Sequence, residues 1–337
     1  MRVGPVPLSF YFFRRPWLPL LFLPALIAPS HAQTEASFQA KLPSARVVYE
    51  ALSASNALLW LASDRDLYKK NGVDVSVVHG RGAMAVQALV SASAEFGAFS
   101  GPSTIAANFG GSDIVLVAAR PNFVVMSIWV RQNSPIKRLE DLKGRTIGVA
   151  LPGSSTHTIA RLALSRVRLI EKDVQFVHHG SLPQIFLSLA NDAVEAGVGS
   201  GPRPGFRELI DLSTEKIPFL QGAIQVQRSF LRSQRPTARN FLKAYVESIK
   251  IAKERPDLAV AAVVKRLKVS TEVAGAAYHS FATVWEQIPY VRTDAVQAII
   301  DMQSKAAGND VRPEQFIDNS VLKELEDSGF VREAYRK

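Results

Sequence analysis

Short apolar runs rich in β-branched and aromatic residues alternate along the chain with longer stretches of helical periodicity. Val47–Tyr49, Val73–Val78 and Phe96–Phe99 have the length and composition of buried strands. The stretch between the last two has apolar positions at helical spacing, and a helix is also expected from Asn56 to Lys70. Strands that alternate with helices at this spacing indicate parallel βαβ units.

The same alternation continues to about residue 200 and then gives way to helices. The pattern predicts further strands at Ile114–Ala118, Phe123–Val130, Thr146–Ala150, Val174–Val177, Ala196–Val198 and Ala223–Gln227. It predicts C-terminal helices at Ala238–Arg255, Leu258–Leu267, Thr271–Trp285, Thr293–Ala307 and Asn319–Ser328. We expect these helices to pack mainly on the first half of the chain.

The pattern repeats at a spacing of one hundred residues without a gap. Val77–Pro102 and Val177–Pro202 are identical at nine of 26 positions, where chance gives about one or two. The matches are Val77/Val177, His79/His179, Gly80/Gly180, Leu89/Leu189, Glu95/Glu195, Gly97/Gly197, Ser100/Ser200, Gly101/Gly201 and Pro102/Pro202. Two copies are too few for a solenoid. The sequence therefore predicts two similar α/β lobes that face each other across a cleft.

The chain is expected to cross between these lobes twice, near Val130 and near Gln225. The first lobe then consists of residues 43–129 and 226–337, and the second of residues 130–225. Each lobe is predicted to be a mostly parallel sheet flanked by helices.

The N-terminus has the pattern of a secretory signal peptide. Arg2, Arg14 and Arg15 precede the apolar stretch Trp17–Ala28, and Ser30–Ala32 is a small-x-small cleavage pattern. The apolar stretch is shorter than the roughly 20 residues that span a bilayer. We expect residues 1–32 to be removed after Ala32.

Composition narrows the compartment and the chemistry. The chain has no cysteine, which excludes disulfides, thiolate metal ligands, a cysteine nucleophile and a lipid on an N-terminal cysteine. An exported protein without a lipid anchor needs a closed compartment, so a bacterial periplasm is expected. The net charge of +10 includes three signal-peptide arginines. Without them, 37 basic and 30 acidic residues leave a charge of +7 on the mature chain. No run of Lys and Arg is interleaved with aromatic residues, so nucleic acid is not the expected partner.

Candidate ligand-binding loops follow the carboxyl ends of the predicted strands, where open parallel sheets bind ligands. The turn Gly153, Ser154, Ser155 and Thr156 offers free backbone N–H groups, hydroxyls and the positive end of a helix, a combination that favours an oxyanion. The alternative is that these residues only cap the helix. Arg81 lies between two glycines and is either a solvated arginine or a fork for a carboxylate or sulfonate.

Signals for metal binding or catalysis are weak. The histidines have no ligand spacing, and no nucleophile elbow, phosphate loop or zinc-protease motif occurs. We therefore expect no metal, no cofactor and no catalytic residues.

Several segments together resemble the periplasmic solute-binding proteins of nitrate/sulfonate/taurine-type ABC transporters, a group that includes binding proteins for thiamine pyrimidine precursors. The segments are Leu58–Ala62, Lys69–Val75, Gln87–Leu89, Glu95–Gly97, Leu139–Gly148, Pro152–Ser155 and Ile317–Leu322. The resemblance implies a two-lobed periplasmic-binding-protein fold of type II with two hinge crossings. It also implies a monomer that closes on a small organic or anionic solute and delivers it to an inner-membrane ABC permease.

Carried over position by position, the resemblance implies a set of ligand-facing residues. These are Ser55, Asn56, Gly82, Ser100, Pro102, Asn122, Ser154, Ser155, Thr156 and Ser200. The loop Leu52–Asn56 lacks the aromatic or acidic residue that several pyrimidine and amine binders use, which favours an anionic or neutral ligand. Two alternatives stay open: a pyrimidine-precursor binding protein or synthase-like enzyme of the same fold, and a periplasmic sensor or docking protein without transport.

Overall fold

The computed structural model describes Met1 and residues 41–201, 203–303 and 311–336. The expected signal peptide, residues 1–32, lies outside these residues except for Met1. Contacts divide the chain into residues 1–41 and residues 42–337, and the second unit contains all of the described helices and strands. None of the helices described is long and apolar enough to cross a membrane.

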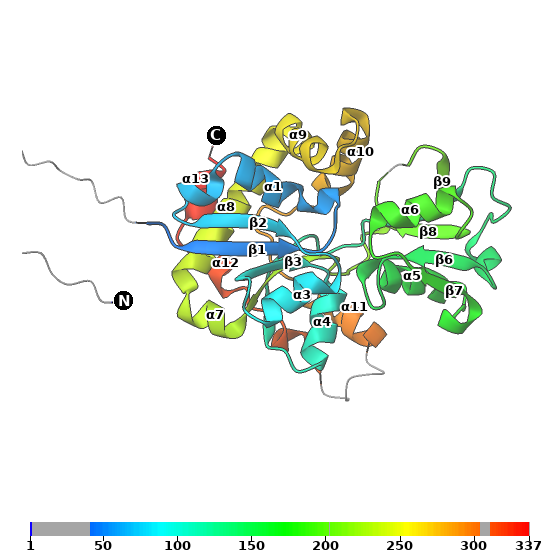
Figure 1. Cartoon of the computed structure of the whole chain (residues 1–337), viewed down its shortest axis with the longest axis horizontal. Coiled ribbons are helices and arrows are strands. Elements are labelled where there is room, and N and C mark those ends of the chain that lie inside the picture. The colour runs from blue at the N-terminus through cyan, green and yellow to red at the C-terminus, as the bar shows by residue number, and fades with distance from the viewer. Residues whose placement is uncertain (2–40, 202, 304–310, 337) are drawn as a thin grey trace, which may run out of the picture. The chain divides into compact units, whose positions relative to one another are not determined.

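Two five-stranded sheets form the framework of this unit (Figure 1). The first sheet has the order β2 (Asp74–His79), β1 (Ser44–Tyr49), β3 (Phe96–Phe99), β10 (Ala223–Gln227) and β4 (Ile114–Ala119). The second has the order β7 (Gln175–His178), β6 (Thr146–Val149), β8 (Ala196–Gly199), β5 (Ser127–Arg131) and β9 (Phe206–Asp211). The predicted two-lobed α/β fold of type II is confirmed.

One antiparallel strand in each sheet comes from the other half of the chain. β10 runs antiparallel between β3 and β4, and β5 runs antiparallel between β8 and β9. The other four strands of each sheet are mutually parallel. The chain therefore passes from the first sheet to the second between β4 and β5, and returns between β9 and β10.

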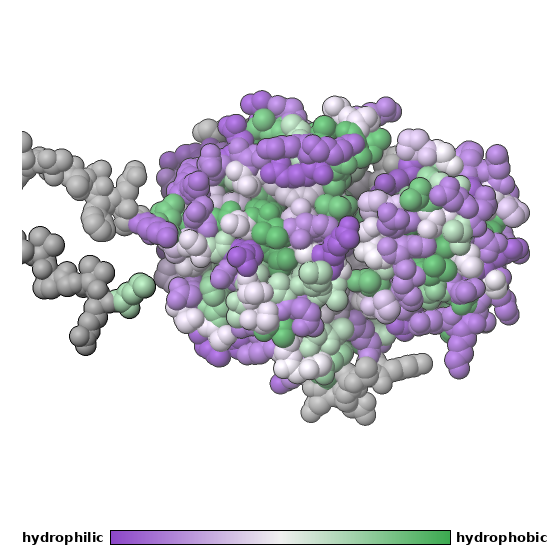
Figure 2. Space-filling model, viewed as in Figure 1, coloured by the Kyte–Doolittle hydropathy of each residue, from purple (hydrophilic) through white to green (hydrophobic). Residues whose placement is uncertain are grey.

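Helices flank both sheets. In the first half they are α1 (Ala57–Asp64), α2 (Leu67–Lys70), α3 (Ala83–Val90) and α4 (Gly101–Phe109), and the second sheet carries α5 (Ser155–Ser165) and α6 (Leu182–Ala190). The C-terminal helices are α7 (Arg228–Ser233), α8 (Arg235–Glu254), α9 (Pro256–Leu267), α10 (Thr271–Ala282), α11 (Thr293–Gln303), α12 (Ser320–Asp327) and α13 (Phe330–Ala334). Figure 2 shows that hydrophilic residues cover much of both lobes on the face displayed.

The largest core lies beneath the first sheet. It joins β1 and β3 to α1, α8, α9 and α10 through fully buried side chains such as Trp60, Phe96 and Phe241. Phe96 and Phe241 stack with ring centroids 4.0 Å apart. A second core holds the inner strands of the second sheet together with α5 and α11. α8 is the longest helix, and ten of its side chains are buried because it crosses α1 and α2.

The repeat is visible in the sheets, but its register is broken at one strand. Val47 pairs with Phe96 and Ile147 with Ala196, a separation of 49 residues in both copies. Val48 pairs with Val78, 30 residues on, whereas Gly148 pairs with Val177, 29 residues on. The gapless alignment is therefore off by one residue at the second strand of each copy. Tyr49 pairs with His79, and its counterpart Val149 pairs with His178 rather than with His179.

Several predicted elements have different boundaries. The helix expected to reach Lys70 is interrupted at Asp66, which has a left-handed backbone with φ 51°. The strand expected at Phe123–Val130 begins only at Ser127, because residues 120–126 form the crossing between sheets. α10 ends at Ala282 rather than at Trp285, and α11 is described only to Gln303.

The matched glutamates of the repeat have the same structural role in both copies. Glu95 Oε2 accepts a hydrogen bond of 2.6 Å from the backbone N–H of Arg46, and Glu195 Oε2 accepts one of 3.1 Å from Thr146. Glu195 also pairs with Arg145 at 2.8 Å. Each carboxylate thus satisfies a backbone N–H in the amino-terminal half of a parallel strand, at Arg46 in β1 and at Thr146 in β6.

We expect Glu95→Ala and Glu195→Ala each to lower the free energy of unfolding by about 1 kcal/mol, because each removes a charged acceptor from a strand terminus. Urea unfolding followed by circular dichroism measures the change. Glu314→Ala, an exposed glutamate elsewhere in the first lobe, is the control. Equal stability of all three variants would show that these carboxylates do not hold the strand ends.

Candidate functional site

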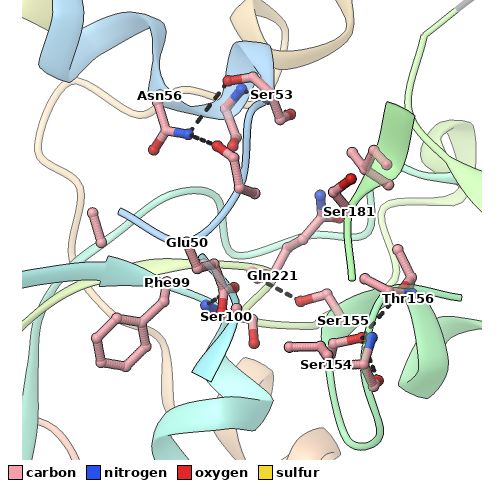
Figure 3. Close-up of a pocket in the computed structure, with 18 of the residues that line it drawn as sticks. Glu50, Ser53, Asn56, Phe99, Ser100, Ser154, Ser155, Thr156, Ser181 and Gln221 are labelled. Atoms are coloured by element: carbon pink, nitrogen blue, oxygen red, sulfur yellow. Dashed lines mark hydrogen bonds between the residues drawn. The ribbon is translucent and has the colours of Figure 1, made fainter. Parts of the chain in front are cut away.

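A cavity lies where the carboxyl ends of the two sheets meet. It contains about 740 Å³ of empty space, part of which is open to solvent. Loops after β1 and β3 supply one wall, loops after β6 and β7 supply the other, and the return crossing adds Gln221 and Gly222 (Figure 3). This is the location at which open parallel sheets bind ligands.

Helix N-termini surround the cavity. Its lining includes Gly82 and Ser100, which precede α3 and α4 in the first lobe. It also includes Ser154 and Ser181, which precede α5 and α6 in the second. The first N–H groups of a helix lack intrahelical acceptors, and the helix dipole adds a partial positive charge there. Four helix N-termini at one cavity favour the binding of a negatively charged group.

Gly82 brings the two lobes together at the cavity wall. Its backbone has φ +51°, and a Cβ atom placed on it would lie 3.0 Å from Leu151 Cδ1 of the second lobe. A larger residue at position 82 would be strained by the positive φ and would require the Leu151 side chain to shift.

Arg120 is a buried cation in the cavity wall, 5% exposed, at the start of the first crossing. Its Nη2 donates to the carbonyl oxygen of Ser55 at 2.8 Å and to Asn56 Oδ1. Its Nε is buried without a hydrogen-bond partner among the described residues. Burial lowers the pKa of Arg120, but a guanidinium stays protonated in proteins. Arg120 therefore fixes the loop before α1, and its charge is partly offset by the nearby Glu50 carboxyl group.

Glu50 is the only acidic residue in the lining. It follows β1 directly, and its Oε1 accepts a hydrogen bond of 2.6 Å from the backbone N–H of Ser100. Burial raises the pKa of Glu50 to about 7, although the Ser100 hydrogen bond and the charge of Arg120 oppose this shift. Near neutral pH the carboxyl group is therefore divided between its charged and neutral forms.

The hydroxyl groups of the Gly153–Thr156 turn are engaged within the protein. Ser154 Oγ donates to the carbonyl oxygen of Leu151 at 2.8 Å and lies 3.0 Å from Thr156 Oγ1. Thr156 Oγ1 accepts from the backbone N–H of Ala150, and Ser155 Oγ donates to the carbonyl oxygen of Gln221 at 2.7 Å. These side chains shape the turn, so the backbone N–H groups are its better candidates for ligand contact.

The structure brings together seven of the twelve predicted ligand-binding residues. Lining the cavity are Ser55, Asn56, Gly82, Ser100, Ser154, Ser155 and Thr156. Their contact with a ligand remains a prediction.

The other five do not line this cavity. Arg81 is exposed, and Pro102 is buried in the first turn of α4. Asn122 bonds to Glu286 and to the backbone at Tyr290 and Arg292. The N–H of Gly153 donates to His157 Nδ1 at 2.9 Å. Ser200 lines a neighbouring cavity. Their positions after strands are as expected, but their side chains or backbone groups are directed elsewhere.

Sequence reasoning missed Glu50, Arg120 and Gln221. Glu50 had a local signal, because it stands directly after the apolar run Val47–Tyr49, at the end of the first strand. The expectation that the first-strand loop offers no acidic group to the ligand is corrected: Leu52–Asn56 lacks one, but Glu50, two residues earlier, lines the cavity. Arg120 and Gln221 had no local signal, because the paired crossings place them at the cavity. No cluster of three or more His, Cys, Asp or Glu suited to a metal occurs among the residues that the structure describes.

Glu50→Gln is expected to stabilise the empty protein at pH 8 by about 1–3 kcal/mol and to leave its stability at pH 4 nearly unchanged. The pKa of Glu50 is raised on folding, so ionisation costs stability as pH rises from the unfolded value of about 4.5 to the folded value of about 7. Urea unfolding at the two pH values measures this difference. A variant that is less stable at pH 8 would show that the charged carboxylate supports the fold.

Comparison with known proteins agrees with this architecture. The family model described as NMT1/THI5 like matches residues 54–259, more than half of the chain. No curated protein sequence matches.

Three solved structures illustrate the fold. The chain is 20% identical to the periplasmic aliphatic sulphonate binding protein SsuA from Escherichia coli, with a TM-score of 0.67, 84% of this chain covered and 100% of that one. It is 15% identical to the periplasmic nitrate-binding protein NrtA from Synechocystis PCC 6803, with a TM-score of 0.70 and coverage of 88% and 92%. The desulfurization enzyme DSZB is 18% identical, with a TM-score of 0.62 and coverage of 84% and 99%.

At these identities the likenesses establish the fold alone. The family match and the fold confirm the resemblance drawn from the sequence segments. The chain therefore belongs to the NMT1/THI5-like family and has the two-lobed α/β fold of the periplasmic nitrate- and sulphonate-binding proteins.

Proposed function

We propose that this chain is the solute-binding component of an ABC importer. In this proposal it captures a small organic or anionic solute between its lobes and delivers it to an inner-membrane permease. The observation that carries the proposal is the cavity itself, which takes its walls from both sheets and from the return crossing. The similar structures named as sulphonate- and nitrate-binding proteins support a binding role. The export signal in residues 1–32 supports a periplasmic location without a lipid anchor.

Closure of the lobes is the expected response to the solute. The two crossings pair with each other: the N–H of Val125 donates to Gln221 Oε1 at 2.9 Å, and Arg120 donates its N–H to the carbonyl oxygen of Gly222. Two paired crossing segments form a hinge that permits rotation of the lobes as rigid bodies. A solute that contacts both walls stabilises the closed arrangement by its differential affinity.

The ligand that fits the positive groups is a small acid such as a sulfonate, nitrate or carboxylate. Four helix N-termini and the Arg120 guanidinium favour a negative group. Protonated Glu50 is compatible with such a ligand, because its neutral carboxyl group donates a hydrogen bond to an oxygen of the anion.

Glu50 also supports a second candidate, a pyrimidine-precursor or amine ligand. A charged Glu50 accepts hydrogen bonds from N–H groups or pairs with a cation, which an acid ligand does not provide. The two candidates differ in the protonation state of Glu50 that they favour, so pH distinguishes them.

Capture without chemical conversion is the role that the lining supports. Glu50 and Arg120 are its only ionisable side chains, and the turn hydroxyls are committed to main-chain partners. Because the enzyme DSZB shares the fold, only the lining, and not the fold, favours capture without conversion.

A thermal-shift panel tests the binding function. Nitrate, ethanesulfonate, short carboxylates and an aminopyrimidine are added to the purified chain, and at least one is expected to raise the melting temperature. A ligand at one hundred times its dissociation constant stabilises the folded state by about 2.7 kcal/mol. Ser181→Trp, which fills the cavity from the second lobe, should abolish the shift, whereas Ser165→Trp at an exposed position should retain it. Absence of any shift across the panel would favour a sensor or docking role.

The pH dependence of affinity identifies the ligand class. Ethanesulfonate and nitrate stay ionised between pH 6 and 8.5, so a change in their affinity reports the protein. We expect their affinity to fall about tenfold between pH 7 and 8.5, because ionised Glu50 repels an anion and its pKa is about 7. Calorimetry measures this dependence, and Glu50→Gln should remove it. Affinity that rises with pH for an aminopyrimidine or amine would instead support the second candidate.

A further inference from the structure

A second cavity adjoins the first and shares Ser53 and Leu182 with it as walls. It contains about 870 Å³ of empty space, part of which is open to solvent. One side is formed by α9 and α10 of the first lobe, and the other by the start of α6 and the loop after β8. An occupant of this cavity would therefore touch both lobes, as the solute in the first cavity does.

Most of the second cavity is apolar. Its aliphatic lining residues are Leu52, Ala54, Leu182, Pro183, Val263, Leu267, Val269, Val273, Ala274 and Ala277. Such a surface receives hydrocarbon and offers nothing to a small inorganic anion. Its only charged residues are Arg203 and Arg266.

Arg266 is compensated within the first lobe. It forms a two-pronged contact with Asp64, with Nη1 2.5 Å from Oδ2 and Nη2 2.8 Å from Oδ1. Lys265 also pairs with Asp64, at 2.9 Å. Arg266 is therefore committed to a carboxylate, and its charge does not call for a ligand.

Arg203 has no such partner. Its guanidinium lies over the Phe186 ring, 4.1 Å from the ring centroid, and Nη2 makes one long contact of 3.4 Å with the carbonyl oxygen of Ser200. Its Nε is buried without a hydrogen bond, and none of the described carboxylates forms an ion pair with it. Burial lowers the pKa of Arg203, and no neighbouring charge offsets this effect. The stacking on Phe186 holds a planar donor fork in one orientation without satisfying it.

We propose that the second cavity holds an apolar segment of the solute that ends in a carboxylate or sulfonate on Arg203. The solute is then an elongated organic acid with two polar ends, one in each cavity, joined by a hydrocarbon segment. This inference rests on the proposed binding function and specifies the class of solute. The oxygens of a carboxylate match the guanidinium fork. Such a group would supply the counter-charge that Arg203 lacks at the end of the apolar second cavity.

Two series of probes test the proposal by calorimetry at pH 7: the α,ω-dicarboxylates from succinate to sebacate, and the monocarboxylates of the same chain lengths. One diacid length is expected to bind at least tenfold more tightly than the monoacid of that length. Arg203→Gln should remove this advantage while changing monoacid affinity less than twofold. Arg203→Lys should restore part of it. Arg168→Gln, an exposed arginine of the same lobe, is the matched control for loss of charge.

A second variant tests the apolar segment independently of Arg203. Ala277 lies on α10 and is partly exposed in the second cavity, so Ala277→Phe fills that space without removing a buried side chain. It should weaken the best diacid at least tenfold and spare the shortest monoacids. Melting temperatures of the empty variants verify that both remain folded.

The outcomes separate this inference from the proposed function. Monoacids that bind, with diacids no tighter at any length and Arg203→Gln without effect, would overturn the inference and leave the binding function standing. If diacid binding is lost in Arg203→Gln but retained in Ser181→Trp, whose first cavity is filled, an acid site at Arg203 is supported and capture in the first cavity is contradicted. A series in which no acid binds would also overturn the inference, whereas the binding function would then depend on the nitrate, ethanesulfonate and aminopyrimidine arms of the thermal-shift panel.

Discussion

The exchange of one antiparallel strand between the two sheets is the constraint on which the rest of the structure depends. β10 is inserted between β3 and β4, where Gln225 donates from Nε2 to the carbonyl oxygen of Phe99 at 2.9 Å and contacts Thr104. β5 is inserted in the same way between β8 and β9. Because each sheet is completed by the other half of the chain, the crossings must run past each other. They place Arg120 and Gln221 at the cavity between the lobes.

The balance of charge in the cavity follows from this arrangement. Four helix ends and one guanidinium supply positive potential, and a single carboxyl group at the end of β1 opposes it. Desolvation favours the neutral form of a buried carboxyl group. Glu50 accepts a hydrogen bond from the backbone N–H of Ser100 at the start of α4, which favours its charged form. Its protonation is therefore poised near neutrality. That property is the reason why we propose Glu50, rather than the turn hydroxyls, as the group that responds to the charge of the ligand.

Matched residues of the two copies support the framework, and the ionisable residues that line the cavities are unmatched. Glu95 and Glu195 secure equivalent strand ends, and Gly97 and Gly197 make room for helix side chains from α3 and α6. Gly101 and Gly201 have different reasons: a Cβ atom on Gly101 would lie 2.3 Å from the carbonyl oxygen of Leu220, whereas Gly201 has φ +77°. Glu50, Arg120 and Arg203 have no matching residue one hundred positions away. The charges of the two cavities are therefore asymmetric although the framework is repeated.

The sequence by itself determined the alternation of strands and helices, the repeat, and the loops that surround the cavity, because these depend on local periodicity and on turn residues such as Gly82 and Ser154. It did not determine that β5 begins at Ser127, that the repeat slips by one residue at its second strand, or that Asn122 bonds to the C-terminal segment. It also did not determine which arginines pair with a carboxylate and which do not. Neither Arg266 nor Arg203 has Asp or Glu within four residues in the sequence, so local context names no partner for either. Only tertiary structure places Asp64 beside the first and Phe186 beneath the second, because their partners come from segments distant in the chain.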